Sequence, residues 1–385
     1  MLGSHNCFRV IAHIVAAELA SQRGTDRREV LTATHPHESL TDGRLAVDSI
    51  EILSLARAVN EFFELDRDGL DEWLLRRRSL AQWRDLALQV LPESDRSIGI
   101  RSGGSTGEPQ ISRHSRAHLE AETEELAGIV GGVTRVLCIT PLNHIYGFLW
   151  GALLSERLAA PLVDGEAAES AASKPEAGDL IIGFPEWWRW FGARSSRFSE
   201  GVTGVTSTAP CPPELIHELR DQGLDRMIEV YGSSETGGIG WREEPDSPYR
   251  LLGHWRSQGG DTLVSTRGLE VKPPDRIRWH DQQHLEPVGR RDGALQIGGM
   301  NVWPQRVRET IETHPDIAEC AIRPFETSGG TRLKAFIVPQ HPDAVPDQDS
   351  LRQWLRQQLT TPERPVRIDF GDQLPRNAMG KLSDW

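Results

Sequence analysis

The chain has 385 residues, with 43 lysines and arginines against 56 aspartates and glutamates, which gives a formal net charge of −13 at pH 7. This length predicts two or three domains, and the acidic balance argues against a nucleic-acid partner held through its phosphates. No apolar run is long enough for a membrane span and no signal-peptide pattern begins the chain, so we expect a cytoplasmic protein. The four scattered cysteines have no CxxC spacing and predict neither a disulfide framework nor a zinc site.

The first 95 residues predict a small helical domain. Apolar side chains recur at helical spacing over residues 10–19, 50–63 and 80–91. Asp48, followed by Glu51 three positions later, is typical of a helix start.

Residues 45–53, with residues 60–65 and 79–83, resemble an acyl or peptidyl carrier domain. In that family the serine of an Asp-Ser-Leu motif carries phosphopantetheine, so the resemblance implies attachment at Ser49. The same serine is equally consistent with a capped, unmodified helix.

Residues 102–110 read SGGSTGEPQ, between an expected strand at 98–100 and an expected helix at 115–128. Strand, small-residue loop and helix together favour a phosphate cradle, in which backbone N–H groups approach the phosphate oxygens. The loop is not a Walker motif, and an ordinary surface turn is the alternative. The residues that we expect to contact phosphate are Ser102, Gly103, Gly104, Ser105, Thr106 and Gly107.

Beyond this loop, apolar strands alternate with helices, which predicts an α/β core with its site at the strand ends. The expected strands are 136–140, 180–184 and 227–231, and the expected helices are 149–158 and 214–222.

Three strand-end segments carry polar chemistry. Residues 141–147 contain His144 and Tyr146, and residues 206–210 form a hydroxyl-rich turn that could admit a flat ring. Glu235 follows the third strand, and a carboxylate beside a phosphate site suits Mg²⁺.

Residues 289–385 predict a small α+β domain, whose size is usual for a domain. The chain ends near Gly380-Lys381, and Lys381 is one of only four lysines. This scarcity favours a role for Lys381 over an incidental charge in a frayed tail.

The order of these motifs resembles the adenylate-forming superfamily of acyl-CoA synthetases, aryl-acid ligases and peptide-synthetase adenylation domains. The resemblance implies a multidomain α/β and α+β fold: an acyl-carrier-like domain (1–95), a shortened adenylation core (96–288) and a mobile C-terminal lid (289–385) hinged at Asp292. It implies Lys381 and His144 as catalytic residues and Glu235 as the Mg²⁺ ligand. Besides the glycine loop, it implies ATP contacts from Thr208, Tyr231, Gly232, Ser234, Asp275 and Arg290. The implied acid-binding residues are His144, Tyr146, Phe184, Ser207, Gly232 and Gly237. Trp187 and Trp188 could line an aromatic slot with Tyr146 and Phe184, and residues 184–191 could equally be a core or interface stripe.

This resemblance implies that ATP and Mg²⁺ activate a carboxylic acid as an acyl-adenylate, which a pantetheine thiol then attacks. The shortened layout is most similar to hydroxybenzoate:acyl-carrier-protein ligases of aryl-polyene and xanthomonadin pigment clusters, so the expected acceptor is an acyl carrier protein. An acyl- or aryl-CoA synthetase that uses free CoA is the alternative. Gln110 and Gln296 stand where the superfamily usually has lysines, and the usual subdomain before the loop is missing. These departures keep open a non-catalytic adenylate-binding or carrier-docking protein.

Overall fold

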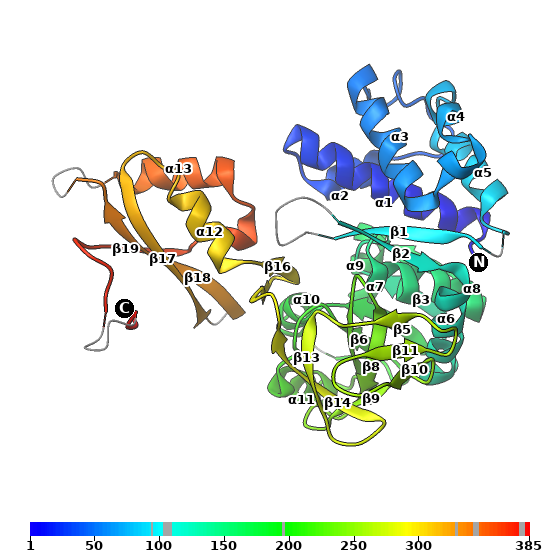
Figure 1. Ribbon diagram of the computed structural model, residues 1–385. Helices are drawn as coiled ribbons and strands as arrows, with labels where there is room; N and C mark the ends of the chain where they lie inside the picture. The colour runs from blue at the N-terminus through cyan, green and yellow to red at the C-terminus, as the bar shows by residue number, and fades with distance from the viewer. Residues whose placement is uncertain (94, 103–109, 195–196, 328–329, 342–345, 377–381) are drawn as a thin grey trace. The chain divides into compact units, whose positions relative to one another are not determined.

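The computed structural model describes residues 1–93, 95–102, 110–194, 197–327, 330–341, 346–376 and 382–385 (Figure 1). The chain divides into two compact units. The first comprises Met1–Ser102, Pro109–Pro273 and Ile277–Pro287, and the second is built mainly from Val288–Trp385. Within the described ranges, no helix combines the length and apolar character that crossing a membrane requires.

The first unit is built on a sheet whose strand order is β13-β14-β9-β8-β7-β6-β5-β3-β4. The strands β4, β3, β5, β6 and β7 pair in parallel, whereas β8 and β9 continue the sheet with antiparallel pairing. The bounds are β3 Arg135–Cys138, β4 Leu162–Asp164, β5 Asp179–Gly183, β6 Thr203–Thr206, β7 Arg226–Ser233, β8 Gly237–Arg242, β9 Tyr249–Leu251, β13 Asp275–Trp279 and β14 His284–Arg290. A smaller antiparallel sheet joins β10 Trp255–Ser257, β11 Leu263–Ser265 and β12 Glu270–Val271.

The α/β alternation that the sequence predicts is confirmed. Its helices are α6 Arg116–Val130, α7 Ile145–Gly147, α8 Leu154–Leu158, α9 Gly165–Ala172, α10 Pro185–Gly192 and α11 Pro213–Asp221. A π-helical stretch, Phe148–Leu153, joins α7 to α8. The helix expected at 149–158 therefore begins earlier, directly after His144.

The N-terminal helices share their core with the sheet. They are α1 Ser4–Arg23, α2 Arg27–Ala33, α3 Ser49–Phe63, α4 Asp71–Arg76 and α5 Leu80–Val90. Buried side chains of α1, α3 and α5 belong to the same hydrophobic cluster as Val136, Ile182 and Ile228 of the parallel strands. The predicted start of α3 is confirmed, because Asp48 and Glu51 form a reciprocal capping box.

The glycine-rich segment lies between two strands, which corrects the expected strand–loop–helix order. Strand β1 (Ser97–Ser102) pairs antiparallel with β2 (Gln110–Ser115), in a register that places Ser102 opposite Gln110. The helix α6 starts only after β2, with Ser115 as its N-cap. The expected strand is therefore followed by a second strand before the helix begins, and only His114 of that second strand is buried.

A buried carboxylate joins the first helix to the end of β4. Asp164 is 6% exposed, and its Oδ2 lies 2.8 Å from Nη2 of Arg9 and 2.6 Å from Nε2 of His13, both on α1. Burial raises the pKa of Asp164, but the hydrogen bond from His13 and the charge of Arg9 outweigh it and hold the pKa below its ordinary value. This contact fixes α1 against the sheet.

The second unit has a three-stranded sheet covered by two helices, α12 (Pro304–Ile311) and α13 (Gln348–Gln358). Strand β17 (Ile317–Thr327) pairs antiparallel with β18 (Gly330–Pro339), and β19 (Arg367–Phe370) pairs in parallel with β18. A short hairpin, β15 Leu295–Ile297 and β16 Met300–Val302, precedes them. Its turn residues Gly298 and Gly299 have φ of 59° and 73°, as a primed hairpin turn requires.

We expect Asp164→Ala to lower the free energy of unfolding by ~3 kcal/mol, because it leaves His13 and Arg9 without their shared carboxylate. Because the folded-state pKa of Asp164 is depressed, this difference should be full at neutral pH and shrink as the pH falls below about 4. Chemical denaturation of both proteins at several pH values measures it.

The matched control is Glu169→Ala, which removes the exposed Arg28–Glu169 pair between α2 and α9. That change should cost less than ~1 kcal/mol. Equal losses in the two variants would contradict a special role for Asp164.

Candidate active site

The strand-end segments that the sequence singled out meet at one edge of the sheet. Strands β3, β5, β6 and β7 are successive parallel neighbours, so their carboxyl ends share an edge. Segment 141–147 follows β3, Phe184 follows β5, and Ser207 follows β6. Gly232 lies near the carboxyl end of β7. Ligands of open α/β sheets bind at this edge.

Tyr146 connects two of these strand ends. Its hydroxyl donates to the backbone oxygen of Gly183 at 3.0 Å, and burial raises its pKa well above the ordinary value. The phenol is therefore neutral and its ring is buried, and Phe184, the residue after Gly183, is half-buried. Trp187 and Trp188, the other candidates for an aromatic slot, lie in a hydrophobic cluster, where the indole of Trp188 donates to the oxygen of Val205.

His144 is the N-cap residue of the helix that carries Tyr146, and it is exposed. The surrounding protein nevertheless desolvates it, and together with the charge of Arg27 this lowers its pKa to about 4. His144 is therefore neutral near pH 7 and can donate or accept one hydrogen bond, but it supplies no positive charge.

The loop before His144 is held by the N-terminal helices. Arg27 of α2 donates to Oδ1 of Asn143 at 2.6 Å and to the backbone oxygen of His13 at 3.3 Å. Desolvation lowers the pKa of Arg27 to about 10, so it remains charged near pH 7. Residues of the helical segment thus support the predicted substrate loop.

The turn after β6 contains two hydroxyl side chains, those of Ser207 and Thr208. Ser207 donates to the backbone oxygen of Val230 at 2.8 Å, which joins β6 to β7. Thr208 has a φ of 76°, which is unusual for a β-branched residue. Its hydroxyl oxygen is buried and has no hydrogen-bond partner among the described residues. A strained residue with an unused hydroxyl at a strand end is typical of a ligand contact.

Glu235 lies in the turn between β7 and β8, with its side chain exposed. The backbone oxygen of the preceding Ser234 contacts Nε2 of His114 at 2.7 Å. On its other side, the hydroxyl of Thr236 contacts the backbone N–H of Ser233 at 3.2 Å and donates to the oxygen of Gly237. The turn is therefore fixed while the carboxylate faces solvent, an arrangement that suits an oxygen-seeking divalent cation. Tyr231, which precedes this turn on β7, is buried against Tyr249.

A residue that the sequence analysis missed lies beneath this turn. Glu122 of α6 is fully buried, and its Oε1 accepts from the backbone N–H of Gly238 at 2.8 Å. A Cβ on Gly237 or Gly238 would lie 2.5 Å from a Glu122 oxygen, so these two glycines make room for the carboxylate. The signal available in the sequence was His118 and Glu122, four residues apart on one helix face.

The predicted residues of the C-terminal part lie on β13, on β14 and just after it. Arg290 and Asp292 form an ion pair at 2.7 Å. The hydrogen bond from Arg290 lowers the pKa of Asp292. Asp275 is the first residue of β13. In the second unit, Lys334 is buried and donates to Asp384 and to the oxygen of Trp385 near the chain end.

Several predicted residues fall outside the described part of the chain, namely Gly103, Gly104, Ser105, Thr106, Gly107 and Lys381. Ser102 is the last residue of β1. The proposed attachment residue Ser49 is exposed at the first position of α3.

Two family models together match most of the chain, from residue 28 to residue 381. Residues 28–304 match the AMP-binding enzyme family, and residues 307–381 match the AMP-binding enzyme C-terminal domain. The chain is 37% identical over 394 residues to a 4-coumarate–CoA ligase of Halorhodospira halophila, a match that covers 99% of each chain. A 4-coumarate–CoA ligase of Rhodobacter capsulatus is 34% identical and covers 98% of this chain and 99% of that protein.

Solved structures support the same fold. An amide bond synthetase from Marinactinospora thermotolerans superposes with a TM-score of 0.64 at 17% identity, covering 97% of this chain and 92% of that one. An o-succinylbenzoate CoA synthetase from Bacillus subtilis also gives a TM-score of 0.64, at 16% identity, with coverage of 98% and 91%. The chain therefore belongs to the AMP-binding enzyme family, as an AMP-forming acid–thiol ligase that activates a carboxylic acid as its adenylate.

Proposed function

We propose that this protein is an aryl-acid–CoA ligase that activates 4-coumarate, or a closely similar phenolic acid, and transfers the acyl group to free CoA. The observation that carries the proposal is similarity to 4-coumarate–CoA ligases over practically the whole chain. Tyr146 and the half-buried Phe184 both follow strands that end at this sheet edge, and aromatic residues there are consistent with the binding of a flat ring.

Free CoA replaces the carrier protein that the sequence analysis expected as acceptor. A carrier-protein ligase, the 3,4-dihydroxybenzoate–[aryl-carrier protein] ligase of Bacillus anthracis, is only 24% identical and covers 73% of this chain and 71% of its own. The hydroxybenzoate and pigment expectations have no other support. Hydroxybenzoate and a carrier thiol are therefore alternatives for the experiments to exclude.

In the proposed mechanism, protein groups stabilise the negative charge on the ATP phosphates during adenylate formation. The acid carboxylate attacks the α-phosphorus of ATP, and pyrophosphate leaves. Glu235 would hold Mg²⁺, which supplies positive charge to the crowded phosphate oxygens. Lys381 and the backbone of residues 103–107 are proposed to stabilise the charge that develops there. The CoA thiol then attacks the acyl carbon, and AMP leaves.

The remaining tasks concern orientation. The hydroxyl of Thr208 is proposed to contact AMP, because it is otherwise unused. Neutral His144 is proposed to position the acid without adding charge. Asp292 is proposed as the hinge at which the C-terminal lid turns between adenylation and thioester formation.

We also propose that residues 1–95 are a structural part of the catalytic unit rather than a working carrier domain. The family match begins at residue 28 and so includes Ser49. Arg27 and the α1 contacts of Asp164 give this segment a supporting task near the site.

The acid is tested with a panel of 4-coumarate, cinnamate, 4-hydroxybenzoate, an amino acid and a fatty acid, by pyrophosphate release with and without CoA. We expect kcat/KM for 4-coumarate to exceed that for 4-hydroxybenzoate by at least about tenfold, because a pocket discriminates by about that factor for small differences in length. Faster turnover of 4-hydroxybenzoate, or thioester formation only on a phosphopantetheinylated carrier protein, would contradict the proposal. No turnover of any acid by protein that binds ATP would indicate a non-catalytic protein.

Lys381→Ala should lower the rate of adenylate formation about 10²–10³-fold, the usual cost of losing one charged stabilising group. Thioester formation from chemically supplied acyl-adenylate should change little, since Lys381 is assigned to the first half-reaction alone. Lys272→Ala is the matched control, because it removes an exposed lysine that has no assigned role. Equal loss in both half-reactions would contradict the assignment.

Ser49 is tested by intact mass after incubation with CoA and a phosphopantetheinyl transferase. We expect no change in mass, and we expect Ser49→Ala to retain full CoA-ligase activity. A gain of one phosphopantetheine that the Ser49→Ala variant abolishes would instead establish the helical segment as a carrier domain.

A further inference from the structure

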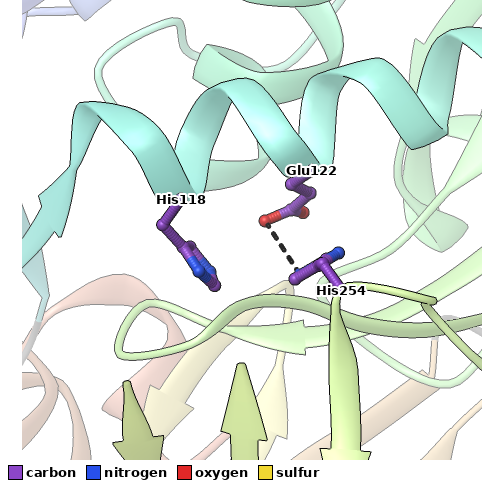
Figure 2. Close-up of side chains that lie close together, drawn as sticks. All are labelled: His118, Glu122 and His254. Atoms are coloured by element: carbon purple, nitrogen blue, oxygen red, sulfur yellow. Dashed lines mark ion pairs between the residues drawn. The ribbon is translucent and has the colours of Figure 1, made fainter. Parts of the chain in front are cut away.

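Beneath the turn that carries Glu235, three buried side chains from two parts of the first unit converge. His118 and Glu122 project from the same face of α6 toward His254, which lies between β9 and β10 (Figure 2). One donor atom from each of the three residues lies within 4.8 Å of the other two. All three residues are at most 5% exposed.

Two of these atoms form a long ion pair with each other but no hydrogen bond to any described residue. Oε2 of Glu122 and Nε2 of His254 are buried, and neither forms a hydrogen bond among the described residues. They lie 3.9 Å apart, which is too long for a hydrogen bond and about 0.5 Å longer than the separation of two ligands on a tetrahedral zinc ion, so a small side-chain movement would bring both onto one ion. Buried polar atoms almost always form hydrogen bonds, so these two atoms indicate that a ligand binds between them.

The surrounding contacts orient Glu122 and His254 toward that position, while Nε2 of His118 contacts the backbone oxygen of Thr236 at 3.3 Å. Glu125 contacts Nδ1 of His254 at 3.2 Å, which leaves Nε2 of His254 to face Glu122 with its lone pair. A carboxylate that holds the far nitrogen of a histidine is the usual outer contact of a metal-bound imidazole. Oε1 of Glu122 is used by Gly238, so only Oε2 is available.

We propose that His118, Glu122 and His254 bind one Zn²⁺ ion, which joins α6 to the segment after β9 and supports the turn of Glu235. Two imidazole nitrogens and one carboxylate oxygen are a donor set that zinc uses, with water as a fourth ligand. The charges also balance, because the ion offsets the carboxylates of Glu122 and Glu125. This site is distinct from the Mg²⁺ position proposed at Glu235, which faces solvent.

The electrostatics of the cluster agree with a cation. Burial raises the pKa of Glu122 to about 7 and lowers the pKa of His118 to about 4. An ion would let Glu122 ionise in its buried position, while the neutral imidazole of His118 is already the form that binds metal. A cleft of about 1100 Å³, lined in part by Glu125, Gly253 and Trp255, lies beside His254 and offers a route for entry.

The experiment uses untagged full-length protein, dialysed against Zn²⁺ and then against metal-free buffer, with metal content measured by mass spectrometry. We expect about one zinc per chain, and a Tm that Zn²⁺ raises and a strong chelator lowers by several degrees. Replacing zinc with Co²⁺ should give the visible absorption of a four-coordinate N/O site. Zinc content near zero, with a Tm indifferent to Zn²⁺ and chelator, would overturn the proposal.

Variants separate this site from adventitious binding. Glu122→Gln and His254→Gln should lose the bound zinc and the Zn²⁺-dependent part of Tm. Glu122→Gln keeps an oxygen that can accept from Gly238, so it should still fold. Glu125→Gln should weaken zinc binding about 10–100-fold without abolishing it. His217→Gln, on the exposed face of α11, is the control and should retain full zinc content. Loss of zinc in the control, or its retention by both cluster variants, would refute the assignment.

Discussion

The site depends on the parallel pairing of β3, β5, β6 and β7. Neighbouring parallel strands end at the same edge of the sheet. Segments far apart in the chain therefore meet there because of strand pairing alone. Tyr146 and Ser207 then lock adjacent strand ends through one hydrogen bond each, to Gly183 and Val230. Because these bonds use backbone oxygens, they hold the edge in place while leaving other surface for ligands.

The N-terminal helices complete this arrangement through buried charge. Asp164, held by two α1 residues, anchors the helices to the sheet, and Arg27 holds the loop before His144. Buried charges tolerate little displacement, because an unpaired charge in the interior is costly. The segment whose motif resembles a carrier domain is therefore bound to the core through buried contacts of α1 and α2.

The turn of Glu235 shows the same use of buried polar groups. Glu122 lies under Gly237 and Gly238, where any larger residue would collide with its carboxylate. Both glycines are thus required because the Glu122 carboxylate approaches them closely. Gly237 is also required by its positive φ, which Gly238 does not have. The proposed zinc ion would add a second support to the same turn, independent of the nucleotide chemistry above it.

The alternation of strands and helices, the capping of α3 and the order of the family's motifs could be predicted from the residues, because they depend on local spacing and on side-chain chemistry. Other features depend on contacts between distant parts of the chain. The strand β2 was missed because its residues are polar and only pairing with β1 makes them extended. Trp187 and Trp188 proved to be core because the strands bring Gly183 and Gly204 against them. The cluster of His118, Glu122 and His254 could not be predicted, since 132 residues separate Glu122 from His254 and only folding brings their side chains together.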